Sequence, residues 1–261
     1  MSNEPGRLQR IRYKLRLRVR TREFCNRVLR RVGLLGLEWK KGLPEELQAW
    51  EYLLKEEGRR WIPSEYRRRM DPQSELQEDL KRLIKAPRGA VVRILDVGAG
   101  PLTNLGKKWE GRTLQLFPVD PLAEEYKALL ARLGIRPPVL SEPGHGERLV
   151  DLFGGEYFDL ANASNSLDHS YDPFLAIRQM FAVIKPQCYV YLWHFAHEGV
   201  AMGYGGLHQW NFDIKRGDMT LSNGRDCHYS LAKEFKGVGT LECEFQDFFG
   251  RKAVIGKLKK L

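Results

Sequence analysis

A short apolar run that ends in a glycine turn constrains the fold of this chain more than any other feature. The run begins at Val91 and stops at Asp96, and Gly98 and Gly100 follow. The turn carries almost no side chain, so backbone N–H groups there can lie close to a ligand. A strand that ends in such a turn is typical of open α/β sheets, which bind nucleotide-like ligands at the carboxyl ends of their strands.

A second strand pattern supports the same kind of site. Residues 114–120 read LQLFPVD and end in Asp120, and a glycine turn followed by an acid about twenty residues later is a nucleoside-binding layout. A carboxylate in that place can accept hydrogen bonds from both hydroxyls of a ribose. The dinucleotide fingerprint also requires a third glycine, to meet a pyrophosphate, where this chain has Thr103. The pattern therefore favours a nucleoside ligand without a pyrophosphate.

Residues 90–195 resemble the class I S-adenosylmethionine-dependent methyltransferases of the small-molecule and glycan type. The glycine turn, Asp120, a fourth strand over 158–165 and a fifth strand over 185–194 occur in the family's order. The resemblance implies an α/β fold, a Rossmann-like, mostly parallel sheet of seven strands that ends in an antiparallel hairpin, here around Gly250. It also implies S-adenosylmethionine as cofactor and methyl transfer as the reaction.

The resemblance assigns the cofactor to the loops after the strands. Asp96 would organise the glycine turn, and Asp120 would bind the ribose. Many members have an acid after the first glycine of the third loop, but this chain has His145 there. The adenine contact would therefore come from Gly146 or from Glu147. The predicted cofactor-binding residues are Asp96, Gly98, Ala99, Gly100, Asp120, Pro121, Gly146, Glu147, Ser164 and Asn165.

The acceptor side is predicted from an insertion after the fifth strand, residues 193–216, which is rich in glycine, histidine and tryptophan. Aromatic faces and fixed polar groups suit a sugar-like or hydroxyl-bearing acceptor. An alcohol loses its proton as the methyl group arrives, so we expect a histidine base, His208 first and His169 second. Segment 203–212 is predicted to fold over the mouth of the pocket. The predicted acceptor-binding residues are Trp193, His197, Tyr204, Gln209 and Trp210.

Structural roles remain open for several of these residues. The two candidate bases can instead merely hold their loops, and Trp210 and Phe212 can belong to the core. His194, His197 and His208 lack the spacing of a metal site on one helix, so we predict no metal.

The region before the sheet is predicted to be helical. Residues 43–58 carry apolar side chains at helical spacing, and Gly58 ends the run. Residues 71–85 begin with Asp71 as an N-cap and Pro72 as the first helical residue. Asp172 and Pro173 repeat that signal after the fourth strand. Trp50, Trp61 and Tyr66 are candidates to line the acceptor pocket, or to pack as ordinary helix residues. The predicted division is a basic amphipathic arm over 1–35, a helical cap over 36–88 and a methyltransferase domain over 89–261.

The net charge of +10 is concentrated at the N-terminus. Residues 1–35 hold eleven Lys and Arg against two Glu, whereas the rest of the chain holds 32 basic and 31 acidic side chains. Apolar and basic residues alternate over 11–20, so this arm is amphipathic as a strand or as a helix. Residues 7–31 suit an anionic membrane surface, a nucleic-acid backbone, or packing on the protein itself. The nearly neutral remainder makes nucleic acid the weaker partner.

Composition narrows the class of function. The four cysteines show no metal or CxxC spacing, so we expect reduced thiols and a cytoplasmic protein, placed at the inner face of the membrane if the arm binds lipid. No apolar run has the length of a membrane span or the character of a signal peptide. The favoured function is O-methylation of a small-molecule, sugar or glycan acceptor, as in polysaccharide biosynthesis. An RNA methyltransferase and a non-catalytic S-adenosylmethionine-binding protein are the alternatives.

Overall fold

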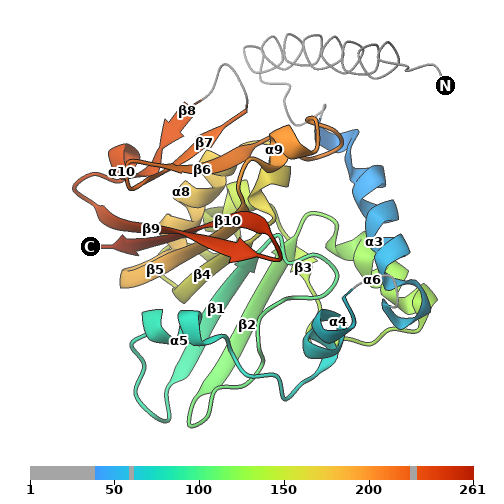
Figure 1. Cartoon of the computed structure of the whole chain (residues 1–261). Helices are drawn as coiled ribbons and strands as arrows, with labels where there is room; N and C mark the ends of the chain where they lie inside the picture. The colour runs from blue at the N-terminus through green and yellow to red at the C-terminus, as the bar shows by residue number, and fades with distance from the viewer. Residues whose placement is uncertain (1–38, 59–61, 224–227) are drawn as a thin grey trace, which may run out of the picture.

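The computed structural model describes residues 39–58, 62–223 and 228–261 (Figure 1). The predicted arm, 1–35, and Trp61 lie outside these residues. The centre of the molecule is a seven-stranded sheet with the order β3-β2-β1-β4-β5-β10-β9. The first five strands in the chain run parallel, and β10 and β9 join β5 as an antiparallel hairpin. The predicted fold class is confirmed. The strands are β1 (Val91–Val97), β2 (Thr113–Asp120), β3 (Glu142–Pro143), β4 (Phe158–Ser164), β5 (Ile184–Phe195), β9 (Gly239–Phe248) and β10 (Arg251–Lys260).

The central strand β1 is buried on both faces, because helices cover both sides of the sheet. Val92 and Ile94 pack with Leu80 of α5 (Glu78–Leu83) on one face. Leu95 and Val97 point to the other face, where α8 (Pro173–Val183) lies. The near-continuous apolar run that precedes Asp96 follows from this double burial.

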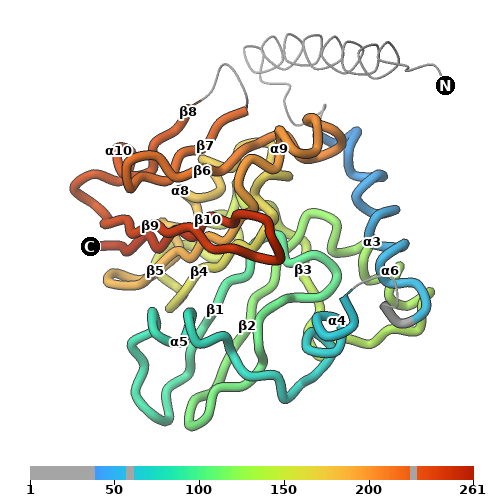
Figure 2. The backbone as a smooth tube through the Cα atoms, viewed as in Figure 1, coloured from blue at the N-terminus to red at the C-terminus, as the bar shows by residue number. Residues whose placement is uncertain are grey.

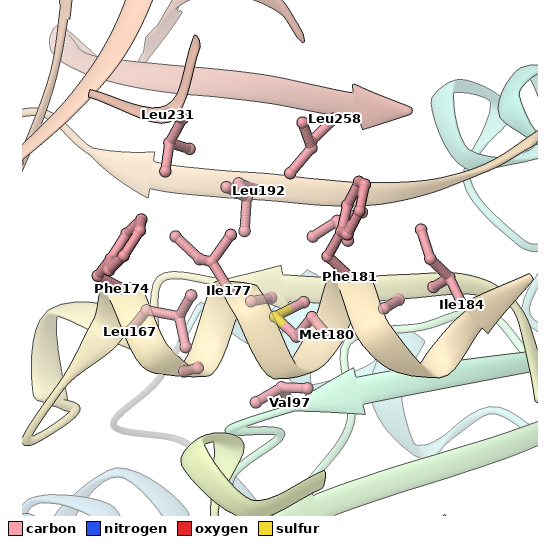
Figure 3. Close-up of a cluster of buried hydrophobic side chains, with 14 of the residues drawn as sticks. Val97, Leu167, Phe174, Ile177, Met180, Phe181, Ile184, Leu192, Leu231 and Leu258 are labelled. Carbon is pink, nitrogen blue, oxygen red and sulfur yellow. The ribbon is translucent and has the colours of Figure 1, made fainter. Parts of the chain in front are cut away.

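Helix α8 begins where the sequence predicts. The Asp172 side chain accepts a hydrogen bond from the backbone N–H of Leu175 at 3.0 Å, and Pro173 is the first helical residue. The apolar face of the helix points Ile177 and Met180 into the core that it shares with the sheet (Figure 3). This packing fixes the short loop between β4 and α8, which carries Asp168 and His169.

A second, three-stranded antiparallel sheet follows the insertion and was not predicted. It consists of β6 (Asn211–Lys215), β7 (Asp218–Ser222) and β8 (His228–Ser230). It lies beside the β9–β10 hairpin (Figure 2). Its inward side chains Phe212, Met219 and Leu221 belong to the same core cluster as α8. Two short helices flank it, α9 (Glu198–Ala201) and α10 (Leu231–Glu234).

The cap contains α3 (Leu43–Gly58), with the predicted bounds, and α4 (Pro63–Met70). Leu54 of α3 packs against α6 (Ala123–Leu133). The predicted helix over 71–85 is wrong in its first half. Asp71 follows the end of α4, and its Oδ1 accepts a hydrogen bond from the N–H of Gln73 at 2.8 Å, as in an Asx-type turn. Glu75 then forms a bridge with Lys108, so helix α5 begins only at Glu78.

The described helices include none with the length and apolar character that a membrane crossing requires.

Candidate functional site

A cleft of about 680 Å³ lies at the carboxyl ends of β1, β2 and β4. The strand order reverses between β1 and β4, so the loops that follow them diverge and leave a crevice. Its volume falls in the range of small-molecule sites. All of the predicted cofactor-binding residues line it, namely Asp96, Gly98, Ala99, Gly100, Asp120, Pro121, Gly146, Glu147, Ser164 and Asn165.

Asp120, at the end of β2, holds the glycine turn. Its Oδ2 accepts a hydrogen bond from the N–H of Gly100 at 3.0 Å, and its Oδ1 accepts one from Leu122 at 2.9 Å. Burial raises the pKa of Asp120 to about 6, although both hydrogen bonds oppose this shift. Each carboxylate oxygen keeps a further lone pair with which it can accept a hydroxyl.

Gly100 adopts a φ of 63°, in the left-handed region that favours glycine. A side chain there would also press against the ring of Trp50, which α3 places over the turn. Trp50 lines the cleft, as the sequence suggests, whereas Tyr66 packs against the α3–α6 cluster. The glycine therefore lets the cap approach the cofactor loop closely.

Asp96, at the end of β1, is fixed by two side chains. It accepts hydrogen bonds from Thr103 Oγ1 at 2.5 Å and from Asn162 Nδ2 at 2.7 Å. Burial raises the pKa of Asp96, and these two bonds act against the rise. Thr103 stands where the dinucleotide fingerprint has glycine, and here it positions a carboxylate. This agrees with a ligand that brings no pyrophosphate to the turn.

Two arginines of α4 line the cleft, and the sequence analysis missed them. Arg68 Nη1 donates to the carbonyl of Asn104 at 2.5 Å, and Arg69 Nη1 donates to the carbonyl of Leu102 at 2.7 Å. Burial lowers the pKa of Arg69 to about 10, so the guanidinium remains charged at neutral pH. The run of three arginines over 67–69 was the one sequence feature that could have indicated them. Such runs, however, usually form a solvent-exposed face.

The third loop forms another wall of the cleft. Glu147 lies in the short 3-10 helix η1 (Gly146–Arg148), and its Oε1 accepts a hydrogen bond from the N–H of Asp172 at 3.2 Å. Burial raises the pKa of Glu147 to about 7. Gly146 and Glu147 both line the cleft, so either can still supply the predicted adenine contact.

The two candidate bases meet in one cluster at the cleft wall. His169 lies in η2 (Leu167–His169), and its Nε2 is 2.9 Å from Nδ1 of His208. The same Nδ1 is 2.7 Å from Oδ2 of Asp168, a residue that the sequence analysis did not select. Asp168 is only 1 % exposed. On the far side of His169, Nδ1 lies 3.4 Å from Oε2 of Glu46 in α3.

Charges in this cluster are coupled. Burial disfavours the imidazolium of His208, but the hydrogen bond and the negative charge of Asp168 outweigh it and raise the pKa of His208. Burial also acts to raise the pKa of Asp168, but His169 and His208 outweigh it and lower the pKa. The arrangement holds a carboxylate beside two imidazoles in the cleft wall.

Of the predicted acceptor-binding residues, all of which the structure describes, Trp193 lines the cleft, and the other four lie outside its lining. Trp210 is 2 % exposed in the core, and its Nε1 donates to the carbonyl of Ser170 at 3.1 Å. Gln209 Nε2 donates to the carbonyls of Tyr204 and Gly206, at 3.0 and 2.9 Å, and so holds its own loop.

Tyr204 and His197 also make contacts away from the cleft lining. The hydroxyl of Tyr204 accepts a hydrogen bond from Asn211 Nδ2 at 3.0 Å, behind the cleft wall. His197 lies outside the cleft, with Nε2 3.6 Å from Oδ1 of Asp213. Both side chains therefore stabilise the insertion itself.

Segment 203–212, the predicted cover of the pocket, divides between the cleft and the core. Within this fully described segment, Leu207 and His208 line the cleft, whereas Phe212 belongs to the core. Leu207 packs so closely on Gly42, just before α3, that a Cβ at Gly42 would overlap it. The insertion and the cap thus meet above the cleft.

Comparisons with known proteins found similarity among solved structures. No family model matches the chain, and no curated protein sequence matches it. Among solved structures, a methyltransferase from Aquifex aeolicus described as S-adenosylmethionine-dependent is 12 % identical, with a TM-score of 0.45, and the match covers 82 % of this chain and 97 % of that one. A second, from Methanosarcina mazei, is 15 % identical, with a TM-score of 0.43 and coverages of 72 % and 99 %.

A third similar structure is the 1,6-didemethyltoxoflavin-N1-methyltransferase of Burkholderia thailandensis, with S-adenosylhomocysteine and its 1,6-didemethyltoxoflavin ligand bound. It is 18 % identical, with a TM-score of 0.40, and the match covers 66 % of this chain and 72 % of that one. The strand order and the C-terminal hairpin of this chain are those of a Rossmann-like, mostly parallel sheet.

Proposed function

We propose that this protein transfers a methyl group from S-adenosylmethionine to an oxygen of an acceptor held in the cleft. One observation carries the proposal: residues from four separate loops, chosen from the sequence as cofactor contacts, line a single cleft of suitable size. The cleft wall beside α3 carries the Asp168–His169–His208 cluster, where an acceptor hydroxyl can be activated.

The polar and charged side chains that line the cleft suit this cofactor. Asp120 is placed for the ribose hydroxyls, and Gly146 or Glu147 for the adenine. Asp96 lies beside the glycine turn, where it suits the ammonium group of the methionine part, and Arg68 and Arg69 suit its carboxylate. Buried acids and guanidinium groups are thus present for each charged or polar part of the ligand.

On binding, S-adenosylmethionine supplies a methyl carbon that forms a bond to the acceptor oxygen as its bond to sulfur breaks, which leaves neutral S-adenosylhomocysteine. The protein contributes alignment, which is worth several orders of magnitude in rate. The acceptor proton would pass to an imidazole of the His169–His208 pair, and Asp168 would stabilise the resulting imidazolium.

The first test is calorimetric titration of the full chain with S-adenosylhomocysteine, followed by incubation with methyl-labelled cofactor and fractionated extracts of the source cells. We expect saturable binding, and label in a small-molecule or glycan fraction. Label in RNA, or copurifying nucleic acid, would favour the RNA alternative. Cofactor binding without turnover on any fraction would favour a non-catalytic binding protein.

Replacing Asp120 with alanine should weaken S-adenosylhomocysteine binding by roughly 1–3 kcal/mol, because a charged hydrogen bond to the ribose is lost. Titration calorimetry measures the change. Glu124 on the outer side of α6 offers a control, since Glu124→Ala removes an exposed carboxylate that pairs with Lys127. Equal affinity in native protein and Asp120→Ala would remove Asp120 from the ribose site.

Cofactor affinity should fall by about tenfold between pH 7.5 and pH 5, because the ionised fraction of a carboxyl with a pKa near 6 falls to about a tenth at pH 5. The carboxylate accepts two hydroxyls, and protonation removes an acceptor site, so acid weakens binding. Asp120→Asn should remove the fall below pH 6. Glu147→Gln should remove any change around pH 7, where Glu147 titrates. An unchanged profile in Asp120→Asn would contradict the assignment.

We further propose that the acceptor is a sugar, glycan or lipid-linked intermediate, methylated beside an anionic membrane surface that residues 7–31 bind. The +9 net charge of residues 1–35 supports this. Deleting 1–35 should abolish salt-sensitive cosedimentation with vesicles that contain an anionic phospholipid, and should leave S-adenosylhomocysteine affinity unchanged. Vesicles of neutral phospholipid are the control. If full-length protein does not cosediment with anionic vesicles at low salt, the membrane proposal is wrong.

A further inference from the structure

Three ligand-type atoms converge in the cleft wall at distances that cannot all be separate two-centre hydrogen bonds. They are Oδ2 of Asp168, Nε2 of His169 and Nδ1 of His208, with separations of 2.7, 2.9 and 3.4 Å. A ring nitrogen carries either one proton or one in-plane lone pair. Nδ1 of His208 can therefore complete its contact with Asp168 or its contact with His169, but not both. One short contact is left without a proton of its own.

A metal ion accounts for this convergence. Bonds of about 2.1 Å place neighbouring ligand atoms about 3.0 Å apart in an octahedral site and about 3.4 Å apart in a tetrahedral one. The three separations lie around these values. The two imidazole rings stand nearly perpendicular, with an interplanar angle of 82° and centroids 4.2 Å apart. Both rings can thus direct a nitrogen to one point, and Asp168 adds a carboxylate to it.

The surroundings of the ligands support the same reading. A metal-binding histidine commonly directs its second ring nitrogen to a carboxylate, which fixes the ring. Nδ1 of His169 lies 3.4 Å from Oε2 of Glu46, and Oε1 of Glu46 in turn accepts a hydrogen bond from Nε1 of Trp50 at 2.8 Å. The buried Oδ1 of Asp168 has no hydrogen-bond partner among the described residues. A nearby cation would offset the cost of burying this carboxylate.

We propose that Asp168, His169 and His208 bind one divalent transition-metal ion, of which zinc is the representative, at the acceptor side of the cleft. Two imidazoles and one carboxylate suit such an ion and leave coordination positions open, as in catalytic sites. His169 and His208 line the cleft, so an open position faces it. The sequence prediction of no metal considered only the histidines of the insertion, and two of the three ligands lie in η2.

The role of the ion rests on the proposed function, although its binding does not. With the ion present, the imidazoles serve as ligands, and the ion takes over their part in activating the acceptor. An acceptor oxygen bound to the ion is more acidic, so its proton is released to water before or during attack. This favours acceptors with a hydroxyl or carboxylate that can bind a metal.

Metal binding can be measured on untagged full-length protein that has been treated with a chelator and dialysed. We expect titration with Zn²⁺ to show about one strong equivalent per chain, and Co²⁺ in its place to give visible absorption bands of an ordered site. His208→Ala should weaken Zn²⁺ binding at least tenfold and remove the Co²⁺ bands. His228→Ala is the matched control, because it removes an exposed histidine of β8 and should change neither readout.

Two further variants keep the test decisive. Asp168→Asn removes the carboxylate ligand, but Asp168 is buried, so a melting curve must show that the variant is folded. The melting curve of His208→Ala, a residue at the cleft, serves for comparison. Glu46→Gln should keep the stoichiometry and weaken Zn²⁺ binding by about tenfold. No strong equivalent in the native protein, or equal binding in His208→Ala, would overturn the inference. Titration of the same samples with S-adenosylhomocysteine distinguishes failure of the metal proposal from failure of the proposed function. A protein that binds the cofactor but no metal refutes the metal site alone.

Discussion

Replacing His208 with alanine should lower the methyl-transfer rate by about 10²–10⁴, the range for losing the group that activates an acceptor. The same variant should bind S-adenosylhomocysteine normally and melt at the native temperature. The physical reason is position: His208 lies in the cleft wall, 2.7 Å from Asp168, and its side chain is 22 % exposed. Its loss breaks the cluster in the cleft wall, whereas the core that α8 shares with the sheet is unchanged.

The measurement is the initial rate with labelled cofactor at saturating acceptor, together with calorimetry and a melting curve. His228→Ala, outside the cleft, is the matched control and should retain the native rate. His169→Ala should also lose rate, because its Nε2 contacts His208 at 2.9 Å. A stable His208→Ala protein with undiminished turnover would exclude the cluster from the reaction. A strongly lowered melting temperature would instead assign His208 a structural role.

The cofactor side of the site could be predicted from the sequence because each contact lies next to the strand that positions it. Asp96, Asp120 and Ser164 stand at strand ends, and an apolar run followed by a polar residue marks such an end directly. In a parallel sheet these ends meet at one edge. The local sequence pattern at each strand end was therefore sufficient to predict that these distant residues line one cleft.

The acceptor side could be predicted only in part, because it depends on how one loop is held. His208 and Trp210 are two residues apart, yet one faces the cleft and the other the core. Gln209, between them, fixes the turn through the carbonyls of Tyr204 and Gly206. No periodicity in the sequence encodes this choice. It follows from tertiary contacts, because Trp210 packs near Tyr229 of the unpredicted sheet β6–β7–β8 and donates to Ser170.

His169 was selected from the sequence as a candidate base, but Asp168 and the contact of both residues with His208 were missed for a related reason. Asp168 and His169 precede the N-cap of α8 and look like an ordinary connection between a strand and a helix. They lie 40 and 39 residues from His208 in the chain. A search for metal ligands within one segment cannot find such a set. Arg68 and Arg69 were overlooked similarly, since they reach the cleft only because α4 packs beside the loop over 101–105.

Replacing Trp210 with alanine should destabilise the protein by about 3–5 kcal/mol, the usual cost of removing a large buried aromatic side chain. Trp210 is 2 % exposed, and its indole N–H donates to Ser170. Alanine would leave a cavity beside Tyr229 and the loop that carries Ser170, and the carbonyl of Ser170 would lose this donor. For a chain of this size the melting temperature should fall by roughly 10 °C.

Two variants identify the cause of that loss. Trp210→Phe keeps most of the buried surface and removes the N–H, so it should cost only about 1–2 kcal/mol. Trp193→Ala is the matched control, because Trp193 is partly exposed and lines the cleft. It should destabilise the protein less and reduce acceptor binding more. If Trp210→Ala melted normally but bound acceptor poorly, the tryptophan would belong to the acceptor site after all, and the boundary between core and cleft would have to move to include it.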